Sequence, residues 1–316
     1  MIRTVLGDIA PDELGPTNYH EHLFQTSPLL PGDELDDPDA SLREARLLAA
    51  SGFAAMVDAT PIGLGRDATG MARISARTGL SVVATTGTHR EAHYHAGHWL
   101  RTLDVARRAK LFVRDIVDGM PDADAIPDKG APAHTPAGDA VRAGLVKAGV
   151  GYWSITPFER TTLDAAAVAH GETGVPVMVH LEFCTAAHEV LDLLEAEGVA
   201  PRRVVLAHAD RDPDPDLHLD LAARGAWLGY DGMARPRTRS EAELLDLAER
   251  VVARGGGTRI LLGGDVARAS RYIAYGGMPG LAYLGERYLP RLRKRIGDEA
   301  TDAMLLANPR TCLSLH

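Results

Sequence analysis

Side chains that commonly bind metal ions stand at the ends of several short apolar segments of this 316-residue chain. They are four histidines, a lysine and an aspartate: His20, His22, Lys147, His180, His208 and Asp265. Imidazole and carboxylate groups are ligands that zinc prefers, and manganese or cobalt also accept them. Unpaired polar groups are costly to bury, and coordination to a cation removes that cost. The pattern therefore predicts a metal centre.

Each of these residues also has an ordinary structural explanation. A single buried histidine is more often hydrogen-bonded in a core than bound to a metal. A lysine within an apolar run can extend its amine to water, and an aspartate after two glycines often caps a turn. A separate explanation of this kind would have to apply independently at each of five segments. A single metal centre explains all of them at once, so we favour it.

Eight short apolar segments rich in β-branched residues alternate with helical patterns. The predicted strands are residues 17–23, 54–60, 81–88, 144–150, 176–181, 203–210, 226–232 and 259–266. Helices are predicted over residues 41–51, with Ser41 as N-cap, and over 161–173, 185–197 and 240–254. Alternation of this kind predicts a parallel sheet, and eight units favour a closed (β/α)8 barrel over an open doubly wound sheet. The carboxyl ends of barrel strands meet at one mouth, which would bring the six metal-ligand side chains together.

The remaining segments fit one domain over residues 1–316. The connection 89–143 is long and rich in Pro, Asp and Gly, which is typical of a lid or mobile loop. No GxGxxG follows the first predicted strands, which disfavours dinucleotide binding. Residues 298–316 predict a terminal helix, then Asn308-Pro309 and a short end segment.

Composition excludes several classes of protein. A formal charge of -9 disfavours nucleic acid as a partner, although a local basic pocket for a small anion is compatible with it. The 45% hydrophobic and 24% charged content is that of an ordinary globular protein. Only two cysteines, no apolar leader and no apolar run of membrane-spanning length predict a cytoplasmic protein without membrane association.

The ordered motifs resemble the phosphotriesterase family of the amidohydrolase superfamily. They are HEHL at 20–23, VKAG at 146–149, VMVH at 177–180, VLAH at 205–208, GGD at 263–265 and NP at 308–309. The resemblance implies a binuclear centre of two divalent cations, with zinc most suitable and manganese or cobalt as alternatives. It assigns His20, His22 and Asp265 to the more buried cation and His180 and His208 to the more exposed one. Lys147, carboxylated by carbon dioxide, would bridge the two cations together with a hydroxide that attacks the substrate.

The same resemblance gives Asp265 the catalytic role of proton acceptor and implies a homodimer. Family activities include hydrolysis of lactones, of phosphorylated sugar lactones and of organophosphate triesters. Arg235 and Arg268 lie in the loops after the seventh and eighth predicted strands, at the basic positions of the subgroup that acts on phosphorylated lactones. Arg235 stands where that subgroup often has lysine. Arginine binds phosphate or carboxylate through paired hydrogen bonds.

We therefore expect a lactonase acting on a phosphorylated or otherwise anionic sugar lactone. The alternatives are an organophosphate triesterase or arylesterase with the same site, and a metal-containing binding protein without catalysis. The complete set of ligand-type residues disfavours the last alternative.

The third connection contains His89, His93, His95 and His98. Helical spacing would pair His89 with His93 and His95 with His98. For these histidines we favour a polar loop segment near the mouth over a second metal site, and we expect Tyr94 or His95 to contact substrate. Cys184 has no obvious base beside it and is predicted to be a packing residue.

Overall fold

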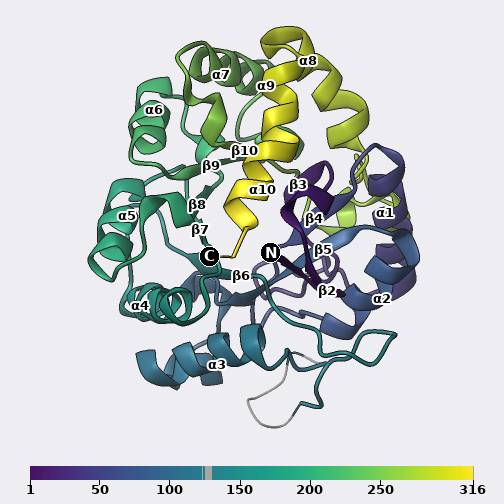
Figure 1. Ribbon diagram of the computed structural model, residues 1–316, viewed down its shortest axis with the longest axis vertical. Helices are drawn as coiled ribbons and strands as arrows, with labels where there is room; N and C mark the ends of the chain where they lie inside the picture. The colour runs from purple at the N-terminus through teal and green to yellow at the C-terminus, as the bar shows by residue number, and fades with distance from the viewer. Residues whose placement is uncertain (123, 125–129, 316) are drawn as a thin grey trace.

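A computed structural model describes residues 1–122, 124 and 130–315, and places eight parallel strands in a ring surrounded by helices (Figure 1). Neighbouring strands pair in the order β10-β9-β8-β7-β6-β5-β4-β3. The amide of Asp265 donates to the carbonyl of His20 at 2.9 Å, which joins the two ends of the sheet. The strands are β3 (Thr17–Glu21), β4 (Ala55–Asp58), β5 (Ser81–Gly87), β6 (Leu145–Gly149), β7 (Val177–His180), β8 (Val204–Ala207), β9 (Trp227–Tyr230) and β10 (Ile260–Leu262). The predicted (β/α)8 barrel is confirmed.

Ten α-helices lie outside this ring or follow it in the described residues. They are α1 (Pro38–Ala50), α2 (Ala68–Thr78), α3 (Val105–Val117), α4 (Pro157–Thr173), α5 (Ala187–Ala196), α6 (Pro215–Ala223), α7 (Glu241–Ala253), α8 (Leu289–Ile296), α9 (Asp298–Asp302) and α10 (Asn308–Leu313). The prediction of Ser41 as N-cap is wrong. Asp37 caps α1 by accepting from two backbone amides, Pro38 starts the helix, and the Ser41 hydroxyl donates to the carbonyl of Leu23 at 2.6 Å.

The long connection between β5 and β6 is partly helical, because α3 lies within it. Residues 123 and 125–129 of the predicted lid lie outside the described residues. The predicted C-terminal end segment is also wrong, since the chain stays helical through Asn308 into α10. The side-chain amide of Asn308 donates to the carbonyls of Gly257 (3.0 Å) and Ile260 (2.8 Å), which attaches α10 to the barrel.

Apolar side chains fill the amino-terminal half of the barrel. Inward-facing residues such as Leu145, Met178, Val205 and Leu261 pack together there and are at most 2% exposed. The hairpin of β1 (Ile2–Thr4) and β2 (Gly7–Ile9) and the helix α10 supply further apolar side chains to this cluster, and Figure 1 shows both termini near the centre of the ring. The carboxyl ends of the strands are left for polar groups. No helix of the described residues has the length and apolar character needed to cross a bilayer.

Candidate metal centre and active site

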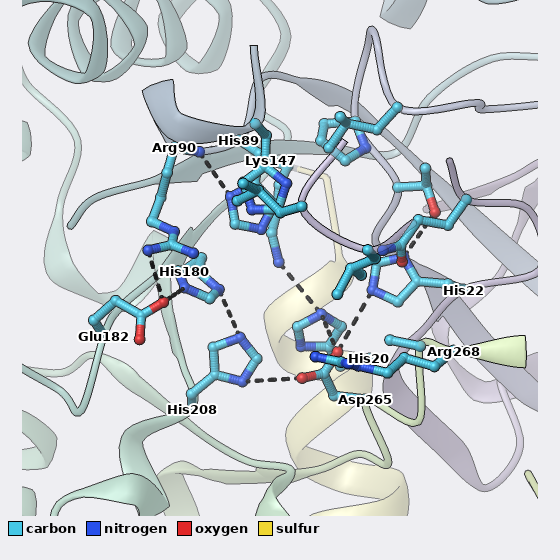
Figure 2. Close-up of a pocket in the computed structure, with 18 of the residues that line it drawn as sticks. His20, His22, His89, Arg90, Lys147, His180, Glu182, His208, Asp265 and Arg268 are labelled. Atoms are coloured by element: carbon cyan, nitrogen blue, oxygen red, sulfur yellow. Dashed lines mark hydrogen bonds and ion pairs between the residues drawn. The ribbon is translucent and has the colours of Figure 1, made fainter. Parts of the chain in front are cut away.

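The six side chains predicted to bind metal line one pocket at the carboxyl ends of the strands (Figure 2). The cavity has a volume of about 310 Å³. Its six predicted ligands are each at most 7% exposed: His20 on β3, Lys147 on β6, His180 at the end of β7, and His22, His208 and Asp265 just beyond β3, β8 and β10. Strands far apart in the sequence thus bring these groups to one place.

One ligand reaches the pocket through unusual backbone geometry. Val205 and Ala207 on β8 both face the barrel interior, so strict alternation would point His208 away from it. His208 instead has a φ of 64°, in the left-handed region, and its side chain lines the pocket. Such a conformation costs roughly 1–3 kcal/mol in a residue other than glycine. Asp265, with a φ of 42°, shares this feature.

His20, His22 and Asp265 form the first group of potential ligands. The Nε2 atoms of His20 and His22 lie 3.8 and 3.6 Å from Oδ1 of Asp265. Burial would raise the pKa of Asp265, but the guanidinium of Arg235 outweighs burial and holds the pKa well below the ordinary value. An ionised carboxylate beside two imidazoles is a donor set able to hold a divalent cation.

His180 and His208 form the second group. Nδ1 of His180 and Nε2 of His208 face each other at 2.8 Å. Burial lowers the pKa of both histidines, to about 3 for His208, so both imidazoles are neutral at neutral pH. Two neutral imidazole nitrogens in this arrangement can share only one proton, whereas a cation between them would accept a lone pair from each.

Lys147 extends from β6 into the same cavity and is 1% exposed. Its Nζ lies 3.4 Å from Nε2 of His20 and 3.1 Å from the sulfur of Met178. Burial lowers the pKa of Lys147 to about 8. An imidazole and a thioether stabilise an ammonium group poorly, so the neutral amine is more accessible here than on a lysine in water.

Asp231 is a residue of the site for which we made no sequence prediction. It is fully buried just after β9, and its carboxylate accepts from Nδ1 of His208 at 2.6 Å, from Nδ1 of His20 at 3.0 Å and from the hydroxyl of Tyr19. Burial raises its pKa, but the two histidines outweigh burial and keep the carboxylate ionised. Asp231 thereby fixes both rings with Nε2 toward the cavity. The sequence did contain a signal for Asp231, because this residue lies at the end of the seventh predicted strand, as the predicted ligands lie at the ends of theirs.

Arg235 and Arg268 both line the pocket, as expected of substrate-binding residues, but their partners differ. Arg235 forms an ion pair with the carboxylate of Asp265 and donates to its backbone carbonyl at 2.8 Å. Arg268 forms a longer ion pair of 3.4 Å with Asp33, and its side chain is 35% exposed. Arg268 is therefore the more available of the two guanidinium groups.

Two further arginines, Arg90 and Arg211, also without a sequence prediction, line the cavity together with Glu182. Arg90 pairs with Glu182 at 2.9 Å, and Arg211 lies 3.9 Å from Glu182 and 3.5 Å from Asp265. Four guanidinium groups thus share the pocket with the carboxylates of Glu182 and Asp265. The guanidinium groups outnumber the carboxylates, so the cavity carries excess positive charge that suits an anionic ligand.

The histidine-rich segment lies beside the pocket. His89 and His93 line it with ring centroids 4.0 Å apart, and His95 and His98 form a second ring pair at 5.4 Å. Tyr94 and His95 are not among the described residues that line the pocket. Tyr94 is 2% exposed, and its hydroxyl accepts from the amide of His89 (2.9 Å) and donates to the carbonyl of Ile62 (2.8 Å).

Comparison with known proteins places this geometry in context. A sequence profile of the phosphotriesterase family matches residues 1–313. A phospho-furanose lactonase of Mycoplasmopsis agalactiae is 29% identical over 331 residues, covering 99% of this chain and 91% of that protein. The crystal structure of a lactonase from Listeria monocytogenes is similar with a TM-score of 0.87 and 29% identity, covering 100% of this chain and 99% of that one. The Escherichia coli phosphotriesterase homology protein, crystallised with phosphate in its active site, has a TM-score of 0.84 and 28% identity, covering 96% of this chain and 100% of that one.

Proposed function

The chain belongs to the phosphotriesterase family and is a hydrolase acting on ester bonds, and we propose that its substrate is a lactone bearing an anionic group, such as a phosphorylated sugar lactone. The observation that carries this proposal is the sharing of one cavity by six metal-ligand side chains and four arginines. The ligand-type residues account for hydrolysis. The arginines account for the charge of the substrate.

The donor set fits two divalent cations. His20, His22 and Asp265 would hold one cation, His180 and His208 the other, and Lys147 would bridge them as its carbamate. Zinc suits these imidazole and carboxylate ligands, and manganese or cobalt would also fit. When bound, such cations polarise an ester carbonyl and lower the pKa of coordinated water from 15.7 toward about 7.

The protein's own residues would position the reactants and move the proton. Asp265, ionised at neutral pH, accepts the proton of the attacking water and returns it to the ring oxygen after the carbon–oxygen bond of the ester breaks. The product is the open hydroxy acid. Asp231 keeps the histidines in the tautomer that presents Nε2 to the cavity. Arg268 and Arg235 would hold the anionic group of the lactone away from the bond that is cleaved.

The charge of the pocket favours a lactone over an organophosphate triester. A triester has no formal negative charge, so it would leave the guanidinium groups without a ligand partner. The cavity of about 310 Å³ is also of a size for a small ring rather than for several large ester substituents. Hydrolysis of triesters or aryl esters is the second candidate function, since the same cations would polarise a phosphoryl oxygen.

A hydrolysis screen with enzyme supplied with zinc, manganese or cobalt tests the proposal. The panel holds matched γ-lactones with and without a phosphate group, together with aryl phosphotriesters and aryl esters. We expect the phosphorylated lactone to have the highest kcat/KM. Higher kcat/KM for triesters would establish the second candidate, and two bound metal ions without turnover of any compound would indicate a binding protein.

A further inference from the structure

Three large aromatic side chains stand exposed at the barrel mouth, next to the metal-ligand pocket. Tyr152 and Trp153 follow β6 and are 63% and 66% exposed, and Phe183 follows β7 and is 46% exposed. These three residues, here called the aromatic ledge, line a second cavity of about 480 Å³. Exposed apolar side chains that gather around a cavity commonly mark a binding site.

The backbone holds the aromatic ledge in place at a conformational cost. Trp153 and Phe183 have φ values of 44° and 54°, in the left-handed region that bulky residues rarely adopt. Thr185 joins the two loops, because its hydroxyl accepts from the amide of Trp153 at 3.1 Å and donates to the carbonyl of Glu182 at 2.6 Å. The rings of Tyr152 and Phe183 meet edge to face with centroids 6.2 Å apart. Strain retained in this way is typical of functional positions.

Arg211 connects the aromatic ledge to the metal-ligand pocket, since it lines both cavities. Its side chain is 10% exposed, and its buried Nε has no hydrogen-bond partner among the described residues. A buried donor without a partner is unfavourable and points to a ligand that would supply the acceptor. The second cavity therefore adjoins the metal-ligand pocket at Arg211.

The arrangement of strands sets the direction of a ligand that uses both cavities. In the ring of eight strands, β6 lies opposite β10, and Arg268 follows β10. Figure 2 shows Arg268 and Glu182, the neighbour of Phe183, on opposite sides of the pocket. A substrate whose anionic group meets Arg268 would thus cross the cavity toward the aromatic ledge.

We propose that the aromatic ledge is a second substrate subsite, which binds a ring with an apolar face carried by the lactone on the side away from its anionic group. This inference rests on the proposed lactonase function. A ring fits better than a flexible chain, because the rings of Tyr152 and Phe183 already pack edge to face and the ring of a ligand can pack against them in the same way. The substrate class becomes an anionic lactone with a ring substituent.

The test compares two phosphorylated γ-lactones that differ only in a phenyl substituent, with the metal-loaded enzyme. We expect the wild type to prefer the phenyl compound, and Trp153→Ala or Phe183→Ala to lower kcat/KM for that compound about threefold to thirtyfold, from the energy of one aromatic contact and its associated burial. The plain lactone should be unaffected, and Trp153→Phe should retain most of the preference. Val168→Ala, an exposed position on α4, is the control. Equal losses on both lactones, or no loss on either, would overturn the proposal.

A binding measurement keeps this inference separable from the proposed function. Trp153 is exposed, whereas Trp227 is buried and Trp99 is partly buried, so stacking on the aromatic ledge should change the emission of Trp153. Titration with the open hydroxy acid carrying the phenyl ring should change emission in the wild type and not in Trp153→Phe. If neither lactone is hydrolysed but this signal is present, the lactonase function fails and the subsite stands. Absence of the signal, or a dimer in sedimentation that Phe183→Arg dissociates, would show that the ledge is not a substrate subsite.

Discussion

Replacement of Asp231 by asparagine tests how the site holds its histidines. The carboxylate accepts from Nδ1 of His20 and from Nδ1 of His208 on separate oxygens. Asparagine has only one acceptor oxygen, and its amide group donates. In Asp231→Asn, one histidine must therefore lose its acceptor or move its proton to Nε2, the atom that faces the cavity. A protonated Nε2 cannot bind a cation.

The size of the effect follows from the bond that is lost. A hydrogen bond to a charged group contributes about 1.5–3 kcal/mol, which corresponds to roughly tenfold to hundredfold in an equilibrium constant. Loss of a hydrogen-bond partner of a metal-bound histidine has effects of about the same size. We expect Asp231→Asn to lower metal affinity about tenfold to hundredfold, and to lower kcat/KM comparably when metal is limiting.

Asp210→Asn is the matched control, because Asp210 is a second buried carboxylate in the same region. One of its oxygens accepts from the amide of Gly232 at 2.8 Å, and the other has no hydrogen-bond partner among the described residues. Burial and the charge of Asp231 raise the pKa of Asp210, which favours the neutral acid, so an amide of the same shape should change little. Metal affinity is measured by competition with a chelator. Equal losses in the two variants, or wild-type affinity in Asp231→Asn, would refute the orienting role.

Three further predictions concern the bridge, the substrate anion and acid stability. Lys147→Ala should lose both metals and activity together, with partial recovery on adding a short carboxylate; metal analysis that finds two ions at full occupancy would contradict the bridging role. Arg268→Ala should lower kcat/KM about tenfold to hundredfold for a phosphorylated lactone and leave a neutral lactone unchanged. Arg235→Ala should slow hydrolysis of both lactones, because Arg235 also pairs with Asp265. Steady-state kinetics with both substrates test these roles, and equal slowing of the two lactones by Arg268→Ala would contradict the assignment of Arg268 to the anionic group. Burial lowers the pKa of His218 from 6.5 to about 4, so its stabilising contribution is complete above pH 6.5 and is lost as pH falls toward 4. The unfolding free energy is measured by urea titration at pH 7 and at pH 4.5. His218→Gln should make the difference between these two values smaller by up to about 3 kcal/mol. The same difference in the variant and the wild type would count against this role of His218.

The barrel and the convergence of the ligand-type side chains were predictable because both depend on chain order. Parallel strands end at one mouth, so a polar side chain at the end of each apolar segment must lie near the others. Lys147 and His180 follow this rule directly, since Leu145 and Met178, two residues earlier on the same strands, face the barrel interior. Alternation along a strand then turns the later residue inward as well.

The finer parts of the site depend on geometry that sequence patterns do not specify. His208 lies on the wrong side of the alternation, and only a left-handed backbone brings it into the cavity. The pairing of Arg235 with Asp265 joins loops after two different strands, and loop conformation has no periodic signal. Tyr94 illustrates the same limit, because its buried hydroxyl serves the backbone of the loop and not the pocket.

Stability and chemistry are separated along the axis of the barrel. Leu145 lies with apolar neighbours in the amino-terminal half, whereas Lys147, two residues later, lies among imidazoles. The closely packed layer beneath the site limits the movement of the strands and so fixes the ligand-type side chains that extend beyond it. The charged groups can therefore lie close together without disrupting the fold, because the free energy that holds the strands comes mainly from the layers of apolar contacts below them and around the barrel. The loops that carry Arg268 and the aromatic ledge stand above this layer, so we expect changes in their sequence to alter the choice of substrate with little effect on the positions of the ligand-type side chains.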